Sequence, residues 1–291
     1  MRGDGPEALE RAAEILARPG PPGVALTGAG ISVESGIPDF RSAGGLWERF
    51  DPLEYATIGA FRKDPERVWR MLDELEAVLA PARPNGGHRA LARLEEIGRM
   101  GTVITQNIDG LHQAAGSRNV VEFHGNGRRL VCVWCGRLRG RDEGMRISEC
   151  GLRIEESAIR IPKSAMEGGG CSPPPDEVSR AVHPPRCECG KIMKPDAVFF
   201  GEPIPEAALR HSHEALAAAS FLLVVGTSAT VAPASEIPYL AGSRGIPVVE
   251  VNLEPTELTG HAASLTILGP AGEVLPELVL RVEERLLGPT S

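Results

Sequence analysis

The stretch Val24-Ala-Leu-Thr-Gly-Ala-Gly-Ile-Ser-Val-Glu-Ser-Gly-Ile-Pro-Asp-Phe-Arg41 decides the fold of this chain. Its first four residues form an apolar run that predicts a short buried strand. The strand opens directly into Gly28 and Gly30, and backbone N–H groups at such a junction can hold a nucleotide pyrophosphate. The usual dinucleotide fingerprint, Gly-x-Gly-x-x-Gly, would need glycine where this chain has Val33. The glycines therefore indicate a nucleotide loop of another design.

Apolar runs and helical periodicity alternate along the rest of the chain. The apolar runs predict strands at residues 24–27, 102–105, 197–200, 221–226 and 247–252. Apolar residues at helical spacing predict helices at residues 7–18, 64–79, 88–97, 207–219, 234–241 and 272–287. This alternation is typical of an α/β fold with a doubly wound parallel sheet. Residues 130–195 are instead rich in cysteine, glycine and proline, which indicates a small module inserted into that fold.

Length and charge limit the classes of function. A chain of 291 residues can form one large domain, or a large domain with a small satellite. No apolar run reaches the ~18–20 residues that span a bilayer, and the first ten residues carry acids, so we expect a cytosolic protein that does not contact membranes. A net charge of −8 without a long basic run argues against direct nucleic-acid binding. An acidic surface would instead suit basic, lysine-bearing partners.

Four of the six cysteines form two short knuckles, Cys132-Val-Trp-Cys135 and Cys187-Glu-Cys189, each followed by glycine. Paired thiolates at short spacing are the ligands of tetrahedral Zn²⁺, and four of them leave no open position for catalysis. We therefore predict a structural zinc site with ligands Cys132, Cys135, Cys187 and Cys189. Cys150 and Cys171 lie between the knuckles and are either spare thiols or a substitute ligand.

Amide and carboxylate side chains follow the strand at residues 102–105, in Gln106-Asn-Ile-Asp109. At the carboxyl end of a parallel strand such groups can hold a carboxamide and a ribose hydroxyl. In the alternative interpretation, Asn107 or Asp109 caps the start of the next helix.

His124 ends a second apolar run, Val120-Val-Glu-Phe123. A lone histidine at a strand end is more often structural than catalytic. Its reference pKa of about 6.5 nevertheless lets the neutral ring accept a proton at physiological pH.

Three segments together resemble the sirtuins, a family of NAD-dependent protein deacylases: Gly28–Arg41, Thr105–His112 and the His124-Gly125 pair. The resemblance extends from about residue 20 to about residue 280. It implies a Rossmann-like NAD-binding domain of residues 1–40, 91–130 and 196–291, with a helical module at 41–90 and a zinc-binding module at 131–195. NAD would be a co-substrate and Zn²⁺ would be structural. The family usually carries Cys-x-x-Cys in the second knuckle, where this chain has Cys-x-Cys.

The resemblance also implies catalytic roles. His124 would be the general base, with Asn107 as the second catalytic residue. Asn107 and Asp109 would lie at the ribose and the nicotinamide. We assign structural roles to His88 and His112, although both occur in contexts similar to those of the family.

The end of the glycine loop, Pro38-Asp-Phe-Arg41, would cover the cofactor. Phe40 would shield the reactive ribose carbon from water, Arg41 would hold the nucleotide, and Asp39 would fix the loop. The alternative is a Pro-Asp turn with a core phenylalanine. The expected NAD contacts are Gly28, Ala29, Gly30, Ser32, Asp39, Phe40, Arg41, Trp47, Gln106, Asn107, Ile108, Asp109, Gly226, Thr227, Ser228, Asn252, Leu253 and Ala271.

The segment Val198-Phe199-Phe200-Gly201 matches the peptide-binding strand of the family. An extended substrate would add there as a strand, with backbone hydrogen bonds supplying affinity and little side-chain selectivity. The resemblance implies that the acyl-lysine oxygen attacks the ribose carbon as nicotinamide leaves, and that His124 then activates a ribose hydroxyl. The products would be free lysine and O-acyl-ADP-ribose. The expected partners are acyl-lysine proteins or peptides.

The acyl group is expected to be neutral. Sirtuins that remove succinyl or malonyl groups carry a Tyr-x-x-Arg pair, and the aligned positions here are Leu72 and Leu75. A carboxylate buried against two leucines would lack a partner, at a cost of several kcal/mol. We therefore expect acetyl or longer neutral chains.

Three other functions fit part of this pattern. An enzyme of the same fold that hydrolyses NAD or transfers ADP-ribose would need the loop and Asn107, but not the peptide strand. A non-catalytic NAD sensor would not need His124 and Asn107. A hydride-transferring dehydrogenase fits least, because the glycine pattern and the closed zinc site are wrong for it.

Overall fold

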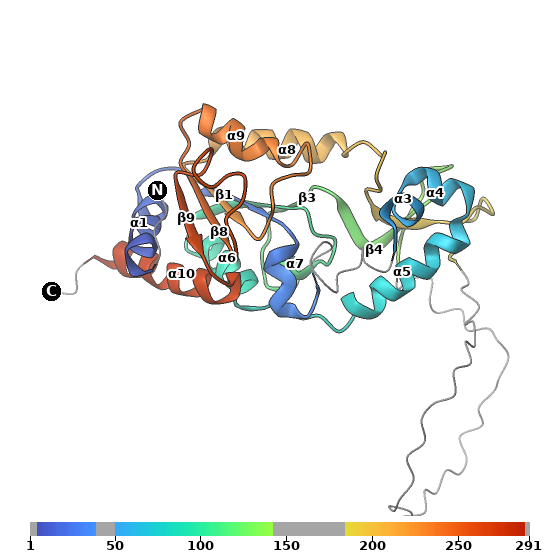
Figure 1. Ribbon diagram of the computed structural model, residues 1–291, viewed down its shortest axis with the longest axis horizontal. Coiled ribbons are helices and arrows are strands. Elements are labelled where there is room, and N and C mark those ends of the chain that lie inside the picture. The colour runs from blue at the N-terminus through green and yellow to red at the C-terminus, as the bar shows by residue number, and fades with distance from the viewer. Residues whose placement is uncertain (1–4, 39–49, 142–183, 289–291) are drawn as a thin grey trace, which may run out of the picture.

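The computed structural model describes residues 5–38, 50–141 and 184–288 (Figure 1). A six-stranded parallel sheet lies at the centre of its larger part, in the order β3-β2-β1-β7-β8-β9. The strands are β1 (Gly23–Thr27), β2 (Met100–Thr105), β3 (Val120–Glu122), β7 (Leu222–Val225), β8 (Val248–Asn252) and β9 (Leu265–Leu268). From β1 the chain adds β2 and β3 on one side of the sheet, and it then returns to the other side of β1 to add β7, β8 and β9. The predicted doubly wound α/β fold is confirmed, and the β1/β7 reversal is where such sheets bind ligands.

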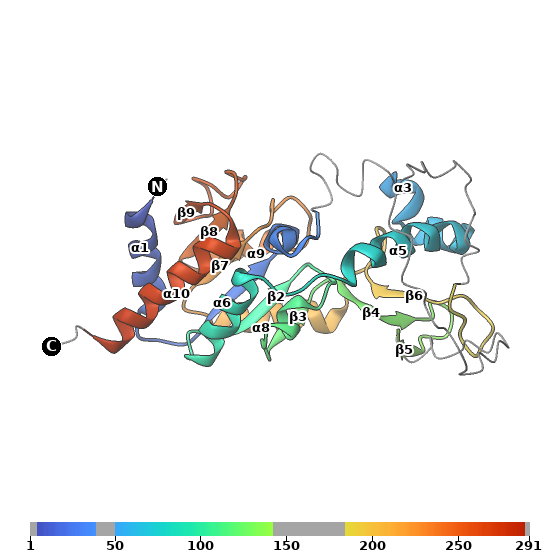
Figure 2. The same cartoon turned by 90° about the horizontal axis from the view of Figure 1, so that it is seen from below.

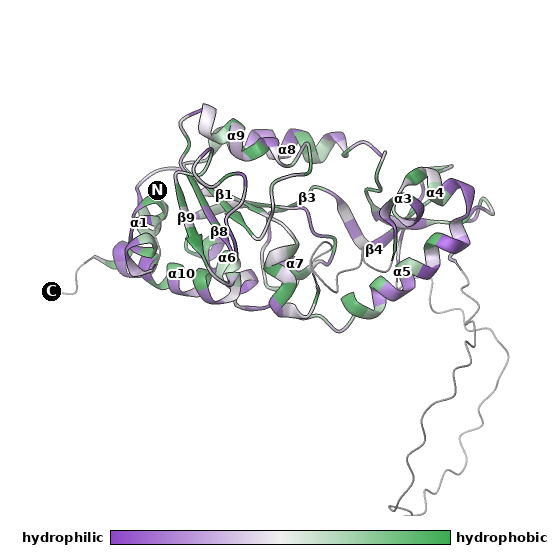
Figure 3. Cartoon of the chain, in the orientation of Figure 1, coloured by the Kyte–Doolittle hydropathy of each residue, from purple (hydrophilic) through white to green (hydrophobic). Residues whose placement is uncertain are grey.

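Helices cover both faces of this sheet because the strands are apolar on both sides (Figures 1 and 3). In β7, Leu223 and Val225 pack in one core with α1, α6 and α10, whereas Leu222 and Val224 pack in another with α8 and α9. The helices are α1 (Pro6–Ala17), α6 (Gly86–Glu96), α8 (Glu206–Ala218), α9 (Glu236–Ser243) and α10 (Ala271–Leu287).

A smaller part of the molecule lies at the end of the sheet farthest from α1 (Figure 2). Its described residues form the antiparallel sheet β5-β4-β6 and three helices. These elements are β4 (Gly125–Val131), β5 (Leu138–Gly140), β6 (Lys194–Ala197), α3 (Pro52–Tyr55), α4 (Ile58–Lys63) and α5 (Pro65–Leu79). They share a core that contains Phe61, Trp69 and Phe199, together with Cys132 and Cys187.

The strand predicted at residues 197–200 is wrong in two respects: its position in the sequence and the sheet to which it belongs. The apolar run at residues 197–200 predicts a strand of the parallel sheet, but β6 ends at Ala197 and pairs antiparallel with β4. The run is apolar because Phe199 packs into the core of the smaller part. The polar sequence Lys194-Pro-Asp is extended because β4 pairs with it, which the sequence does not reveal.

The predicted helices are confirmed, with ends that shift by one or two residues. Helix α6 begins earlier than predicted because the Asn85 side chain accepts the N–H groups of Gly87 (2.9 Å) and His88 (3.4 Å). The predicted domain boundary at residue 90 falls inside this helix, and the one at residue 130 falls inside β4. The division into three modules stays a prediction.

Several predicted features lie outside the described residues: Asp39, Phe40, Arg41, Trp47, Cys150, Cys171 and the segment 142–183. Among the helices that the structure does describe, none has the length and apolar character needed to cross a membrane.

Candidate active site

The predicted glycine loop is held against the end of β7 by backbone contact. After β1, the chain forms the short 3-10 helix η1 (Ala29–Ser35). The Gly30 N–H donates to the Gly226 carbonyl at 2.8 Å. A Cβ on Gly30 would lie 2.7 Å from the Gly226 Cα, and one on Gly28 would lie 2.7 Å from the Thr227 Cβ. Side chains at these glycines would therefore separate the loop from β7, so close packing of two backbones explains them.

A hydrogen-bonded polar cluster lies beside this loop, at the carboxyl end of β2. Ser32 donates its hydroxyl to Asp109 at 2.8 Å. The Asn107 amide donates to the Gly28 carbonyl at 3.0 Å and to the Ser32 hydroxyl at 3.2 Å. Asp109 also accepts the N–H of Leu111 at 2.9 Å, at the start of α7 (Leu111–Ala114). The N-cap residue of α7 is Gly110, which has no side-chain cap, so Asp109 supports the start of this helix from one residue earlier while it also contacts Ser32 of η1.

Gln106 connects the ends of three neighbouring strands. Its N–H donates to the Thr27 carbonyl of β1 at 2.9 Å. Its side-chain amide donates to the Thr227 hydroxyl, just after β7, at 3.0 Å. The predicted contacts that follow β1, β2 and β7 therefore meet at one edge of the sheet.

His124 lies at the other side of Gln106, between the end of β3 and the start of β4. Its Nδ1 is 3.0 Å from the Gln106 carbonyl oxygen. A carbonyl can only accept, so Nδ1 carries the proton and Nε2 has a free lone pair. Burial lowers the pKa of His124, and the bond to Gln106 opposes this shift. The ring is therefore neutral at physiological pH and can accept a proton through Nε2.

Two further histidines, His88 and His112, are buried beneath the cluster, with ring centroids 4.9 Å apart. Thr27 donates its hydroxyl to Thr105 at 2.9 Å, so it accepts from Nε2 of His112, also at 2.9 Å. His88 Nε2 lies 3.4 Å from the Ser32 hydroxyl. Burial lowers the pKa of His88 to about 4 and that of His112 to about 3. Both rings are therefore neutral supports of the site.

The remaining predicted cofactor residues lie along the same edge. Thr227 and Ala271 are buried, Asn252 is half-buried at the end of β8, and Leu253 is exposed. Ala271 is the first residue of α10, and the N–H of its neighbour Gly272 donates to the Glu34 carboxylate of η1 at 2.6 Å. Glu34 was not among the predicted residues. No local pattern could have identified it, because its partner is more than 230 residues away in the sequence.

The expected peptide segment follows β6 and is anchored at both ends. The Val198 N–H donates to the His124 carbonyl at 2.9 Å. The Phe200 N–H donates to the Ala56 carbonyl at 2.9 Å, and the Phe200 carbonyl accepts the Ile58 N–H at 3.1 Å. Phe199 points into the core, whereas Phe200 is 49% exposed. Much of the backbone of this segment is therefore already paired, which limits the strand addition that the sequence predicts.

The two expected acyl-chain residues differ in their surroundings. Leu72 is 5% exposed in the core shared with Phe61 and Phe199, and Leu75 is half-buried one turn further along α5. The Arg141 guanidinium lies near the same helix, but it forms a 2.8 Å ion pair with Glu76.

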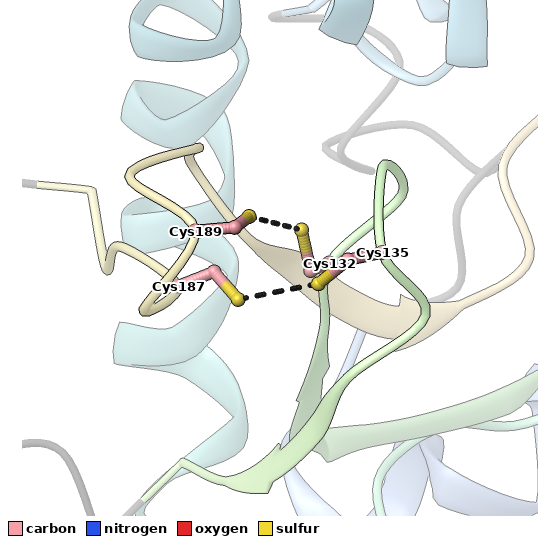
Figure 4. A group of neighbouring side chains, drawn as sticks. All are labelled: Cys132, Cys135, Cys187 and Cys189. Carbon is pink, nitrogen blue, oxygen red and sulfur yellow. Dashed lines mark hydrogen bonds between the residues drawn. The ribbon is translucent and has the colours of Figure 1, made fainter.

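The four knuckle cysteines converge in the smaller part (Figure 4), with all their sulfur atoms within 4.8 Å of one another. Cys132 and Cys189 have sulfurs 3.6 Å apart, and Cys135 and Cys187 have sulfurs 3.5 Å apart. Tetrahedral Zn²⁺ with bonds of about 2.3 Å places its sulfurs about 3.8 Å apart, so the four thiolates fit zinc.

The glycine after each knuckle is required by the backbone. Gly136 and Gly190 have φ of 73° and 82°, and their N–H groups donate to the carbonyls of Cys132 and Cys187, both at 2.8 Å. The Cys-x-Cys knuckle therefore closes a turn that is one residue shorter than the first, and both turns end at a glycine with positive φ.

Comparisons with known proteins agree with this geometry. A model of the Sir2 family matches residues 28–233. NAD-dependent protein deacylase 2 of Pyrobaculum aerophilum is 46% identical over 264 residues, which cover 90% of this chain and 92% of the relative. NAD-dependent protein deacylase of Aquifex aeolicus is 41% identical over 237 residues, covering 81% and 85%.

Solved structures of similar proteins cover nearly the whole chain. A Sir2 homologue in complex with NAD has a TM-score of 0.77 and 37% identity, covering 95% of this chain and 94% of its own. Sir2Af2 bound to a myristoylated histone peptide has a TM-score of 0.71 and 34% identity, covering 97% and 98%.

Proposed function

This chain belongs to the Sir2 family of NAD-dependent protein deacylases, and from that premise we propose that it removes neutral acyl groups from lysine side chains of proteins. The observation that carries the proposal is the arrangement at the sheet edge. The glycine loop, the Asn107–Ser32–Asp109 cluster and the free Nε2 of His124 lie together, joined through Gly28, Gln106 and Thr227.

NAD fits the donors at this edge. When bound, it supplies an electrophilic ribose carbon with nicotinamide as the leaving group. We propose that η1 and the loop after β7 hold its phosphates, because the closely packed glycines leave backbone room there. Asn107 and Asp109 would hold the nicotinamide ribose, and Asn252, Leu253 and Ala271 the adenosine. The latter three residues follow β8 or begin α10 on the same edge.

His124 acts as the general base in this proposal. The Gln106 carbonyl fixes its tautomer, so the ring presents a bare Nε2 without having to lose a proton first. Because burial lowers its pKa, His124 keeps this form at neutral pH. The backbone carbonyl of His124 also accepts the N–H of Val198, so the proposed base is bonded directly to the expected peptide segment.

The acyl preference follows from α5. Leu72 and Leu75 offer no cation to an acidic acyl chain, and the guanidinium of Arg141 is paired with Glu76. Beside these two leucines, a succinyl carboxylate would therefore lack a partner among the residues that the structure describes there, at a cost of several kcal/mol. Acetyl and longer alkyl chains have no such cost.

The decisive experiment measures nicotinamide release from NAD by the wild type and by His124→Ala, with and without an acetyl-lysine peptide. Release that depends on the peptide, with deacetylation lost in His124→Ala, is the expected result. The matched control is His213→Ala, because His213 is exposed on α8 away from the sheet edge. Release without peptide would instead support NAD hydrolysis or ADP-ribosyl transfer, and NAD binding without release would support a sensor.

A further inference from the structure

A buried lysine lies next to the expected peptide segment. Lys194, the first residue of β6, is 3% exposed. Its Nζ is 3.0 Å from the Glu202 carboxylate and donates to the carbonyls of Pro195 (3.1 Å) and Ala197 (2.5 Å). It also lies 4.6 Å from the centroid of the Phe199 ring. A buried ammonium is costly unless it is paired and hydrogen-bonded, and here each of its three N–H groups has an oxygen acceptor.

Glu202 closes a turn around the segment from the other side. The carboxylate oxygen that faces Lys194 also accepts the Phe199 N–H at 2.8 Å. The Glu202 N–H donates back to the Phe199 carbonyl at 2.9 Å. Gly201, the third residue of this turn, has φ of 86°, which a type II turn requires and which glycine adopts without strain. Both polar groups of the Phe199 backbone are thus occupied by Glu202.

This arrangement decides which backbone groups a peptide can use. Phe200 is already bonded to residues 56 and 58, and the Val198 N–H to His124. Within the part of the chain that the structure describes, the Val198 carbonyl and the backbone groups of Gly201 remain without a partner. The orientation of these groups depends on the turn, and the turn depends on Glu202 and Lys194.

We propose that Lys194 and Glu202 are positioning residues for the acyl-lysine peptide, acting by holding residues 198–201 in a fixed turn beside His124. The inference rests on the proposed function. The pair touches neither η1 nor the loop after β7, which form the expected cofactor site, and its contacts run to the segment 195–199. The effect of losing it therefore falls on peptide binding.

A purely stabilising role is a weaker explanation of the pair. Replacing a buried ion pair by apolar side chains of similar volume is often neutral or stabilising, because removing two charges from water can cost more than their mutual attraction returns. A second pair in the same small sheet, Arg129–Asp196 at 3.0 Å, joins β4 to β6 at the surface. Asp196→Asn is therefore a control that removes a neighbouring charge from β6 while keeping the Lys194–Glu202 contact and the hydrogen bonds of the turn.

The test is steady-state kinetics in which acetyl-lysine peptide and NAD are varied separately. We compare the wild type with Lys194→Met, Lys194→Arg, Glu202→Gln and Asp196→Asn. For Lys194→Met and Glu202→Gln we expect KM for the peptide to rise about tenfold or more, with kcat and KM for NAD within about twofold, because only uniform peptide binding is lost. Lys194→Arg keeps the charge, so its KM for the peptide should lie between the values of these two variants and that of the wild type. Asp196→Asn should have the KM of the wild type.

If Lys194→Met does not fold, Glu202→Gln answers the question, because Glu202 is partly exposed and the amide removes the negative charge that holds Lys194. An unchanged KM for the peptide, or an equal rise in both KM values, would overturn the inference while leaving the deacylase intact. Binding of a fluorescent acetyl-lysine peptide to the wild type is measured in parallel. A wild type that neither binds nor deacylates it would refute the proposed function, and the inference with it.

Discussion

At the scale of single residues, the buried histidines make stability depend on pH. His88 and His112 have pKa values of about 4 and about 3, because burial disfavours their charged forms. In the unfolded chain both return to about 6.5. Their contribution to the free energy of unfolding is complete above pH 6.5. It is lost as the pH falls towards the pKa values of the folded protein, because only the unfolded chain takes up protons in that range. The slope should approach about 2.5 kcal/mol per pH unit near pH 5.5.

Urea unfolding between pH 7.5 and 5.5, with zinc in excess, measures this slope. His112→Asn should reduce it by about one proton's share, or ~1.3 kcal/mol per pH unit. A free energy of unfolding that stays constant over this range would mean that the two rings are accessible to water and not buried as the structure has them.

A second residue-scale prediction concerns Gly30. Its Cβ in Gly30→Ala would lie 2.7 Å from the Gly226 Cα, which is backbone and cannot turn away as a side chain can. We expect a loss of about 1–3 kcal/mol in the free energy of unfolding and weaker NAD binding, measured by urea unfolding and calorimetric titration. Gly59→Ala is the control, because Gly59 lies in α4 with its nearest contact at 3.9 Å. That variant should be as stable as the wild type or slightly more so.

At the scale of elements, α10 is capped from a distance. Its N-cap is Pro270, which makes no side-chain cap, and the Gly272 N–H is instead satisfied by Glu34 of η1. Glu34→Ala should cost about 1 kcal/mol in the free energy of unfolding, because a helix N-terminus favours an anionic acceptor. Glu273→Ala removes an exposed acid from the same first turn and should cost less. Equal costs in urea unfolding would show that charge alone matters and not the bond that joins η1 to α10.

Some of these elements could be predicted from the sequence and others could not. Strands β1, β2, β7 and β8 are apolar on both faces, and the long helices α5 and α10 have a clear period, so their existence could be predicted. Strand β9 is a short run interrupted by Thr266, and β6 is polar, so neither produces a recognisable pattern. Asn107 and His124 could be proposed because they stand in segments that resemble motifs of the family, close to the ends of predicted strands. The partners Thr27 and Glu34 depend on contacts between distant segments, which no local pattern contains.

At the scale of the whole molecule, the zinc site and the expected peptide segment share one core. Cys132 and Cys187 are buried together with Trp69, Leu72 and Phe199. The chain connects this core to the parallel sheet next to His124, where β3 ends and β4 begins, and again between β6 and α8. The two cores of the parallel sheet contain none of these residues. Loss of the metal should therefore act first on the smaller part.

Zinc removal by a strong chelator at pH 7.5 tests this separation. We expect faster amide hydrogen exchange in β4, β6 and residues 198–202, with β7 and β8 still protected, because four thiolates around Zn²⁺ supply much of the stability of a small module. Peptide binding should be lost before NAD binding. Cys132→Ser should reproduce this pattern, whereas Cys171→Ser should retain one zinc per chain by elemental analysis. If exchange instead rises equally in β7, the two parts unfold as one cooperative unit, and the zinc stabilises the cofactor domain as much as the module that contains it.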